Sequence, residues 1–198
     1  MLLHERLKNY RLLLASQSPR RRELLGGCGL PYTLTDKYPC EERYPADLPA
    51  DEVPEYLSRL KSEAYPNQLE SNDILLTADT VVIAGGTVFG KPRNRDEALQ
   101  MLHALSGRSH RVVTGVTLRD RERSRTFGVR SDVWFRRLSD EEIAHYVDTY
   151  RPFDKAGSYG VQEWIGYVGI ERLDGSFYNV MGLPVQRLYT ELEQFLQR

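Results

Sequence analysis

The chain has 198 residues, of which 40% are hydrophobic and 28% charged, a composition typical of a globular protein long enough to bury a core. Its 27 basic and 28 acidic residues give a formal charge of −1, so no overall field attracts it to nucleic acid or to a membrane surface. Cys28 and Cys40 are too few for a disulfide framework and lack metal-binding spacing, which predicts reduced thiols in a cytoplasmic protein. The N-terminus lacks a signal-peptide pattern and no apolar run has the length of a membrane span, so we expect no membrane association.

The first apolar run, Leu12–Ala15, predicts a short buried strand. Ser18 is expected to be the N-cap of the helix that follows, with its hydroxyl available to the first amides, and Pro19 suits the first turn. A strand that leads directly into a helix N-terminus forms an anion site, because free amides and the positive end of the helix dipole meet there. Arg20–Arg22 add guanidinium groups that suit phosphate. A capped helix with a solvated basic face is the alternative interpretation of these arginines.

Glycines end this helix before a second strand, which is predicted over Tyr32–Asp36. The proline-rich segment Lys37–Asp51 is typical of a surface loop. Asp51 is expected to cap a helix whose apolar residues recur at helical spacing from Val53 to Ala64. Lys61 lies near the edge of that apolar stripe, where an isolated lysine is typical of a snorkelling surface residue.

Ile74–Ala84 is predicted to form a central strand that is apolar on both faces. Gly85-Gly86 is a hairpin turn signal, and the chain is expected to return through Thr87–Phe89. Asn94 with Glu97 resembles a capping box and predicts the start of the next helix.

Two further strands are predicted over His110–Leu118 and Thr126–Leu138. Ser139 and Glu142 form a capping box that opens another helix. The segment Asp154–Gln162 is punctuated by glycine and is predicted to be a loop.

Near the C-terminus, Tyr167–Leu173 and Ser176–Val180 are expected to form a hairpin, and a last helix is expected from Pro184. Hairpins and meanders outnumber clean βαβ units in this pattern, so the chain is predicted to be an α/β protein with a mixed sheet. Its length predicts one domain over residues 1–198.

Asp79 interrupts the apolar strand Ile74–Ala84, although aspartate is disfavoured inside strands. A buried carboxylate needs a hydrogen bond, a cation or a metal, so Asp79 is a candidate to hold Mg²⁺ or to activate a water beside a phosphate. An aspartate at a strand end that caps a loop is the alternative. Lys91, just past the hairpin, and Lys155, in the glycine-punctuated loop, can both approach the same place as Asp79. Together with the arginines of the first helix they would surround the carboxylate with cations, which is typical of phosphoryl chemistry.

Several familiar site types are excluded. No G-x-x-x-x-G-K-[ST] string occurs, so the chain is not a P-loop NTPase. The four histidines have no metal-ligand spacing and are assigned no role. Ser16 and Ser18 lack an evident His–Asp partner set, which argues against a serine hydrolase.

Several segments, in the same order, resemble the Maf family of nucleoside triphosphate pyrophosphatases. The matching strings are Leu14-Ala15-Ser16-Gln17-Ser18-Pro19-Arg20-Arg21, Ala78-Asp79-Thr80-Val81-Val82 with Gly90-Lys91-Pro92, Leu105-Ser106-Gly107-Arg108-Ser109-His110, Asp154-Lys155-Ala156-Gly157-Ser158-Tyr159-Gly160-Val161-Gln162 and Asn179-Val180-Met181-Gly182-Leu183-Pro184. Several motifs in one order are far more specific than any single motif. The resemblance implies a mixed twisted central sheet flanked by helices, with two lobes around a nucleotide cleft, as in Maf and ITPase-like proteins.

Members of this family hydrolyse a nucleotide between its α- and β-phosphates, with a divalent metal, to a monophosphate and pyrophosphate. The resemblance therefore implies this activity with Mg²⁺ or Mn²⁺, in a homodimer without a stable nucleic-acid complex. By position, Asp79 corresponds to the proton acceptor for the attacking water, and Glu42 and Asp79 to the metal ligands. The residues implied to surround the triphosphate and its metal are Ser16, Arg21, Glu42, Lys61, Lys91 and Lys155. Many relatives have glycine after Gln162, whereas this chain has Glu163-Trp164.

Arg20, Thr80 and Gln162 resemble the branch that acts on dTTP and UTP, whereas the 7-methyl-GTP branch tends to carry an aromatic residue, a glutamine and a glutamate there. The chemistry of Gln162 supports the first branch, because one amide can pair with both the N3–H donor and the O4 acceptor of uracil or thymine. A guanine edge offers two donors, which a carboxylate satisfies better. Leaving a buried group unpaired costs about 1–3 kcal/mol, which is enough for discrimination.

The predicted function is that of a cytoplasmic pyrophosphatase of dTTP and UTP that also removes modified nucleotides. One alternative is the 7-methyl-GTP branch. The other is a nucleotide- or nucleic-acid-binding regulator that uses the same arginines without turnover. Asp79 favours an enzyme, because a pure binder gains nothing from a carboxylate beside the phosphates.

Overall fold

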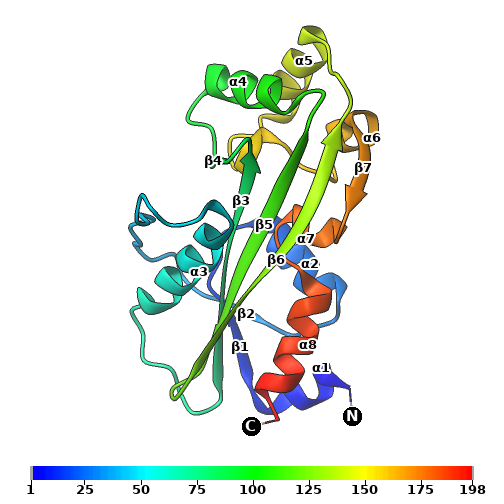
Figure 1. Cartoon of the computed structure of the whole chain (residues 1–198). Helices are drawn as coiled ribbons and strands as arrows, with labels where there is room; N and C mark the ends of the chain where they lie inside the picture. Colours follow the sequence, from blue (N-terminus) through cyan, green and yellow to red (C-terminus); the bar gives the residue numbers. More distant parts are fainter. Residues whose placement is uncertain (1, 198) are drawn as a thin grey trace. The chain divides into compact units, whose positions relative to one another are not determined.

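The computed structural model describes residues 2–197, in which strands and helices alternate through most of the chain (Figure 1). The elements are α1 (Leu3–Arg6), η1 (Leu7–Asn9), β1 (Arg11–Leu14), α2 (Pro19–Gly27), β2 (Thr33–Leu34), η2 (Ala50–Glu52), α3 (Val53–Glu63), β3 (Asp73–Ala84), β4 (Thr87–Phe89), α4 (Arg95–Leu105), β5 (Ser109–Arg119), β6 (Ser124–Phe135), α5 (Asp140–Tyr150), η3 (Ala156–Ser158), α6 (Trp164–Gly169), β7 (Ile170–Asp174), α7 (Phe177–Met181) and α8 (Val185–Phe195), where η marks a 3₁₀ turn. Within these described residues, no helix combines the length and apolar character that a bilayer span requires.

The strands form a mixed sheet in the order β2-β1-β3-β5-β6-β7, with β4 paired to β3. Strand β1 runs parallel to β2 and β3, whereas the β3–β4 and β6–β7 pairs are antiparallel. The β3–β4 turn is made by Gly85 and Gly86, whose φ angles of 57° and 80° lie in the region that glycine adopts at little cost. The predicted mixed α/β sheet flanked by helices is confirmed.

The chain divides into two compact units. The first comprises the chain through Asp79, Thr114–Val129 and the chain from Gly182 onward; the second comprises Thr80–Val113 and Arg130–Met181. Strands β3, β5 and β6 each contribute residues to both units, and the boundary in β3 falls directly after Asp79.

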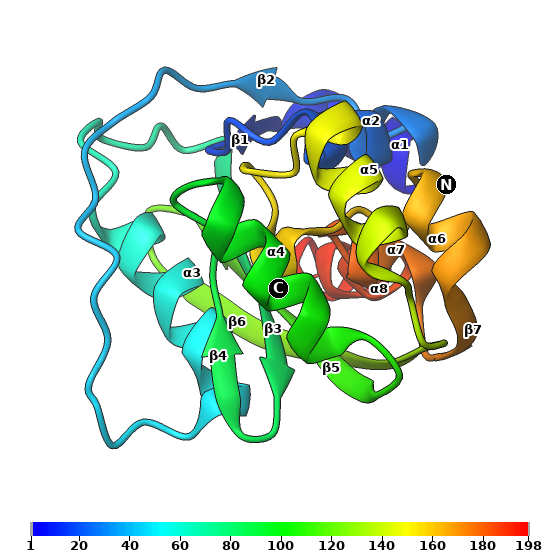
Figure 2. The same cartoon turned by 90° about the horizontal axis from the view of Figure 1, so that it is seen from above.

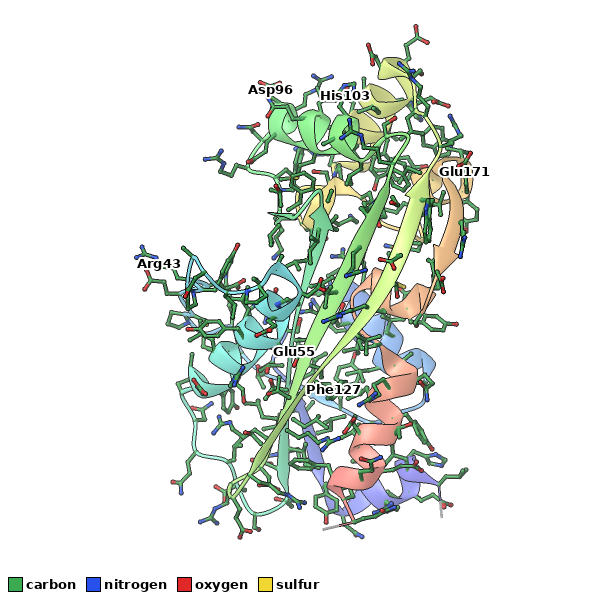
Figure 3. The ribbon with its side chains drawn as sticks, in the orientation of Figure 1. Arg43, Glu55, Asp96, His103, Phe127 and Glu171 are labelled. Carbon is green, nitrogen blue, oxygen red and sulfur yellow. The ribbon has the colours of Figure 1, made fainter. Side chains whose placement is uncertain are left out.

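In the first unit, α3 lies on one side of the strands and α8 on the other (Figure 1). Two glycines allow α3 to pack closely against the sheet. A Cβ atom at Gly115 would lie 2.2 Å from the Pro54 carbonyl carbon, and one at Gly128 would lie 2.3 Å from a carboxylate oxygen of Glu55. Figure 3 shows Glu55 between α3 and the strands. A larger residue at Gly115 would therefore push away the helix that carries Lys61, whereas one at Gly128 would displace the Glu55 side chain.

In the second unit, α4 and α5 lie side by side (Figures 1 and 2). Both predicted helix starts are confirmed, because the Glu97 amide donates to Asn94 Oδ1 at 2.9 Å and the Glu142 amide donates to Ser139 Oγ at 3.2 Å. The Glu142 carboxylate also accepts from Arg136 at 2.6 Å and from the Ser139 amide, which lowers the pKa of Glu142 to about 2.

The predicted C-terminal hairpin is wrong. Residues 164–169 form the helix α6, strand β7 pairs with β6, and α7 replaces the expected return strand. The cause is tertiary, because the Asn179 side chain is buried and donates to the Val112 carbonyl at 3.3 Å and to Ser131 Oγ at 3.0 Å. Ser176 Oγ accepts from the Asn179 amide at 3.3 Å, which stabilises the turn at the start of this helix.

Two predicted helix caps also differ. Glu52, not Asp51, is the N-cap of α3, because the 3₁₀ turn Ala50–Glu52 leads directly into the helix. Ser18 does occupy the N-cap of α2, but its side chain forms no capping hydrogen bond. Instead, the Ser18 amide donates to Ser16 Oγ at 3.3 Å.

The buried side chain of His110 is expected to make the free energy of unfolding depend on pH. Its side chain is 4% exposed, Nε2 lies 2.7 Å from the Tyr159 hydroxyl, and burial lowers the pKa of His110 to about 4. Because the folded pKa lies below the unfolded value of about 6.5, this stabilising contribution is complete above pH 6.5 and is lost as the pH falls toward 4. At about 1.4 kcal/mol for each pKa unit, the loss is about 3 kcal/mol.

We expect His110→Gln to lose less stability than the wild type between pH 7 and pH 4.5, measured as the free energy of unfolding in urea. Glutamine does not titrate, so the two pH profiles should differ in slope by the His110 contribution. Parallel profiles would contradict a buried neutral histidine at this position.

Candidate active site

The corner between β1 and α2 is organised by Arg21. Its Nη1 donates to Ser16 Oγ at 3.2 Å and to the Ala78 carbonyl at 2.9 Å, and its Nε donates to the Gly182 carbonyl at 2.8 Å. One side chain thus ties together three segments that are distant in sequence, and it holds the Ser16 hydroxyl at the helix start.

The pKa of Arg21 is affected by its burial and by nearby carboxylates. Burial lowers the pKa of Arg21, and the nearby carboxylates of Asp79 and Glu42 oppose this effect. The alternative of a solvated basic face is therefore wrong for Arg21, which is partly buried and bonded to backbone carbonyls. Arg20 is partly exposed in the first turn of α2.

A carboxylate–lysine–carboxylate cluster lies at the end of the first unit's part of β3. Lys61 Nζ is 2.6 Å from Asp79 Oδ1 and 3.1 Å from Glu42 Oε2. The side chains of Asp79 and Lys61 are 12% and 17% exposed, whereas that of Glu42 is 49% exposed. Because Asp79 lies inside β3 and its partner is an ammonium, the interpretation as a strand-end cap is wrong. The interpretation of Lys61 as a surface residue is also wrong, because its side chain is only 17% exposed and its ammonium pairs with two carboxylates.

The loop that carries Glu42 is attached to α3. The Tyr38 hydroxyl donates to the Lys61 carbonyl at 2.7 Å, and burial raises the pKa of Tyr38 to about 12, so it remains a neutral donor. Figure 3 shows Arg43 at the outer edge of this loop, where it pairs with Glu41 at 2.8 Å. Glu42 thus faces Lys61 while its neighbours face outward.

The donor set of this cluster fits a magnesium-type ion. One carboxylate oxygen of Asp79 and one of Glu42 both contact the Lys61 ammonium. Across residues 2–197 no group of three or more His, Cys, Asp or Glu side chains is arranged to hold a metal. Mg²⁺ is commonly bound by one or two carboxylates, completed by substrate phosphates and water. The chain could therefore hold such an ion together with a phosphate ligand.

The second unit brings together three segments expected to contact substrate. The Gly157 amide donates to the Gly90 carbonyl at 3.0 Å, which joins the Lys155 loop to the turn before Lys91. Gly157 has a φ angle of 66°, and a Cβ atom there would lie 2.8 Å from Val82. Only glycine allows this loop to lie directly on β3, shortly after Thr80.

In this loop Lys155 is buried and Gln162 is half-buried, whereas Lys91 is exposed. Lys155 Nζ is 2.8 Å from Asp154 Oδ1 and 3.0 Å from Glu163 Oε1. The Gln162 Oε1 atom is buried and accepts no hydrogen bond from the part of the chain that the structure describes. A buried acceptor of this kind is able to receive a donor from a ligand.

A family model described as Maf-like protein matches residues 11–195. The chain belongs to the Maf-like protein family. It is 53% identical over 193 residues to the dTTP/UTP pyrophosphatase of Porphyromonas gingivalis W83, covering 96% of this chain and 97% of the relative. It is 52% identical to the protein of that name from Bacteroides thetaiotaomicron, covering 95% and 97%.

The similarity extends to more distant relatives. A dTTP/UTP pyrophosphatase from Christiangramia forsetii is 40% identical, covering 98% of this chain and 99% of the relative. Among solved structures, a HAM1 protein from Coxiella burnetii is 15% identical over 93% of this chain and 99% of that chain, with a TM-score of 0.47. A likeness of that size carries no conclusion about function.

Sequence reasoning missed part of the site of this Maf-like chain. Glu163 stood out only as a departure from glycine, and no sequence signal singled out Tyr146 on α5. In the structure, Glu163 contacts both Lys155 and Tyr146. The available signal was an acidic residue directly after Gln162, within reach of the lysine at the start of the same loop.

Proposed function

We propose that this Maf-like protein hydrolyses dTTP and UTP to the monophosphate and pyrophosphate. The observation that carries the proposal is the pairing of Asp79 with Lys61 at 2.6 Å in a largely buried position. A chain about half identical to proteins named dTTP/UTP pyrophosphatase over nearly its whole length supports the same activity. A carboxylate held by a lysine is suited to accept a proton from water while the lysine neutralises phosphate charge.

In the proposed reaction, water attacks the α-phosphorus as the anhydride bond between the α- and β-phosphates breaks. Asp79 takes one proton from the water, and pyrophosphate leaves with the electron pair of the broken bond. Lys61 holds the Asp79 oxygen in place and adds positive charge beside the phosphates. Asp79 and Glu42 would hold a divalent ion, Mg²⁺ or Mn²⁺, which neutralises phosphate charge when bound.

The other residues that the family resemblance implies are also proposed to contact the nucleotide. Ser16 and Arg21 would act at the phosphates, together with Lys91 and Lys155. Gln162 would read the base, because its buried Oε1 fits an acceptor for the N3–H of uracil or thymine. Arg20 and Thr80 are proposed to contribute to the same base preference.

The test is a panel of nucleoside triphosphates assayed for pyrophosphate release with Mg²⁺ and with Mn²⁺. We expect kcat/KM to be highest for dTTP and UTP and the products to be dTMP or UMP with pyrophosphate. Highest activity on 7-methyl-GTP would show that the chain belongs to the 7-methyl-GTP branch instead. Tight nucleotide binding without product would favour a regulator.

We expect Arg21→Ala to lower kcat/KM for every triphosphate by a similar factor of about 10–150, corresponding to about 1.5–3 kcal/mol for a lost charge-assisted hydrogen bond. The change also leaves the Ala78 and Gly182 carbonyls without this donor, so the free energy of unfolding should fall as well. Arg22→Ala is the matched control, because the Arg22 guanidinium donates to the exposed Gln17 carbonyl and is not among the residues proposed to bind phosphate. A loss confined to one base would remove Arg21 from the phosphate site.

We further infer that the protein is cytoplasmic and acts as a homodimer without membrane or stable nucleic-acid partners. Its two free cysteines support the first inference, and the family resemblance supports the second. Residues 1–198 are proposed to work as one domain, since the family match over 11–195 includes parts of both units. Modified pyrimidine nucleotides are proposed as further substrates.

A further inference from the structure

Glu163 links Lys155 to the interior of the second unit. One of its carboxylate oxygens lies 3.0 Å from Lys155 Nζ, and the other accepts a hydrogen bond from the Tyr146 hydroxyl. The Glu163 side chain is 20% exposed and that of Lys155 is 9% exposed. The two oxygens of one carboxylate thus contact two different neighbours, Lys155 and Tyr146.

The residue that binds this carboxylate, Tyr146, is itself held in place by several contacts. It is fully buried on α5, its ring stacks on Tyr150, and its hydroxyl accepts from the Gly160 amide at 3.0 Å. Burial, together with the bond to Glu163, raises the pKa of Tyr146, so the hydroxyl remains a neutral donor. Tyr146 therefore fixes both the backbone of the loop and the carboxylate that holds the lysine.

Asp154 also contacts the Lys155 ammonium, at 2.8 Å, but its side chain is 52% exposed. Exposed ion pairs are weak because water and salt screen them and because both side chains lose freedom. The Glu163 side chain is more buried, so water and salt screen its ion pair with Lys155 less than the pair with Asp154.

We propose that Glu163 is a positioning residue for Lys155, which it holds in readiness for the triphosphate. The inference rests on the proposed function. A lysine side chain is long and flexible, so an existing ion pair removes part of the ordering cost of phosphate binding. When phosphate oxygens take over the ammonium, Glu163 keeps its bond to Tyr146 and the loop keeps its shape.

The proposal is tested by a double-mutant cycle on kcat/KM for dTTP, using Glu163→Gln, Lys155→Ala and the double variant. Glutamine has the shape of glutamate and can still accept from Tyr146, but it carries no charge to hold the ammonium. We expect a loss of about tenfold for Glu163→Gln in the wild-type background, mainly as a higher KM, and less than about twofold when Lys155 is already alanine.

Two further variants complete the experiment. Glu141→Gln removes an exposed carboxylate from the first turn of α5 and should leave kcat/KM unchanged. Tyr146→Phe removes the anchor but keeps the ion pair, so it should cause a smaller loss that also disappears in the Lys155→Ala background; it carries the test if Glu163→Gln does not fold.

Equal losses from Glu163→Gln in both backgrounds would overturn the proposal, because the residue would then act through the fold alone. A gain in kcat/KM would also overturn it, since repulsion of phosphate would outweigh positioning. Full activity of Lys155→Ala would overturn it as well. All three results require a wild type that turns over dTTP, whereas a wild type without turnover would contradict the proposed function itself.

Discussion

Replacing Asp79 with asparagine is expected to lower kcat on dTTP by a factor on the order of 10²–10⁴ or more while the fold stays intact. The amide oxygen can still accept from Lys61, whose Nζ lies 2.6 Å from Asp79 Oδ1, so the local geometry has a substitute partner. The amide cannot take a proton from water, and it is a weak ligand for a divalent ion. The loss of the base should therefore lower kcat, and the weaker metal ligand should add a smaller loss of nucleotide affinity.

The measurement is kcat and KM for dTTP with purified Asp79→Asn protein, with thermal unfolding as the check on folding. Asp148→Asn is the matched control, because Asp148 pairs with Arg95 on the surface and has no place in the proposed site. Retention of half the wild-type activity by Asp79→Asn would refute the assignment of this carboxylate as the base.

Gln162→Glu is expected to lower kcat/KM for UTP and dTTP by about 30- to 150-fold, corresponding to about 2–3 kcal/mol. A carboxylate can still accept from the base N3–H, but it places a second acceptor against O4 where the amide had placed a donor. The loop can relieve this repulsion only by moving or by protonation of the new acid. The new carboxylate would also stand next to Glu163, which already holds Lys155.

The measurement compares kcat/KM for UTP, dTTP and 7-methyl-GTP at fixed metal and salt. Guanine-type bases should lose less, because a carboxylate accepts well from their two donors. Gln186→Glu provides the control on the exposed side of α8, where the side chain bonds to Thr190. Equal losses on all three nucleotides would show that Gln162 shapes the loop and does not read the base.

Local patterns were sufficient to predict much of the scaffold. The Leu12–Ala15 run followed by Ser18 and Pro19 is confirmed as β1 and the start of α2, because strand, turn and helix signals there depend on neighbouring residues. The Gly85-Gly86 turn is confirmed for the same reason. Asp79 was a visible exception in an apolar strand, and its burial agrees with that expectation.

Tertiary partners were beyond the reach of these patterns. The pairing of Asp79 with Lys61 joins a strand to a separate helix, and no periodicity identifies such a pair. A return strand was expected over Ser176–Val180, but the structure has the helix α7 there, with the buried Asn179 amide bonded to Val112 and Ser131. Glu163 was noticed only as an unusual residue, since its partner Tyr146 lies on another element.

The most direct test of the central claim is the identity of the products formed from dTTP, separated by anion-exchange chromatography, with wild-type and Asp79→Asn protein side by side. The account predicts dTMP and pyrophosphate in equal amounts from the wild type and almost none from the variant. Formation of dTDP and inorganic phosphate, or equal product from both proteins, would contradict it.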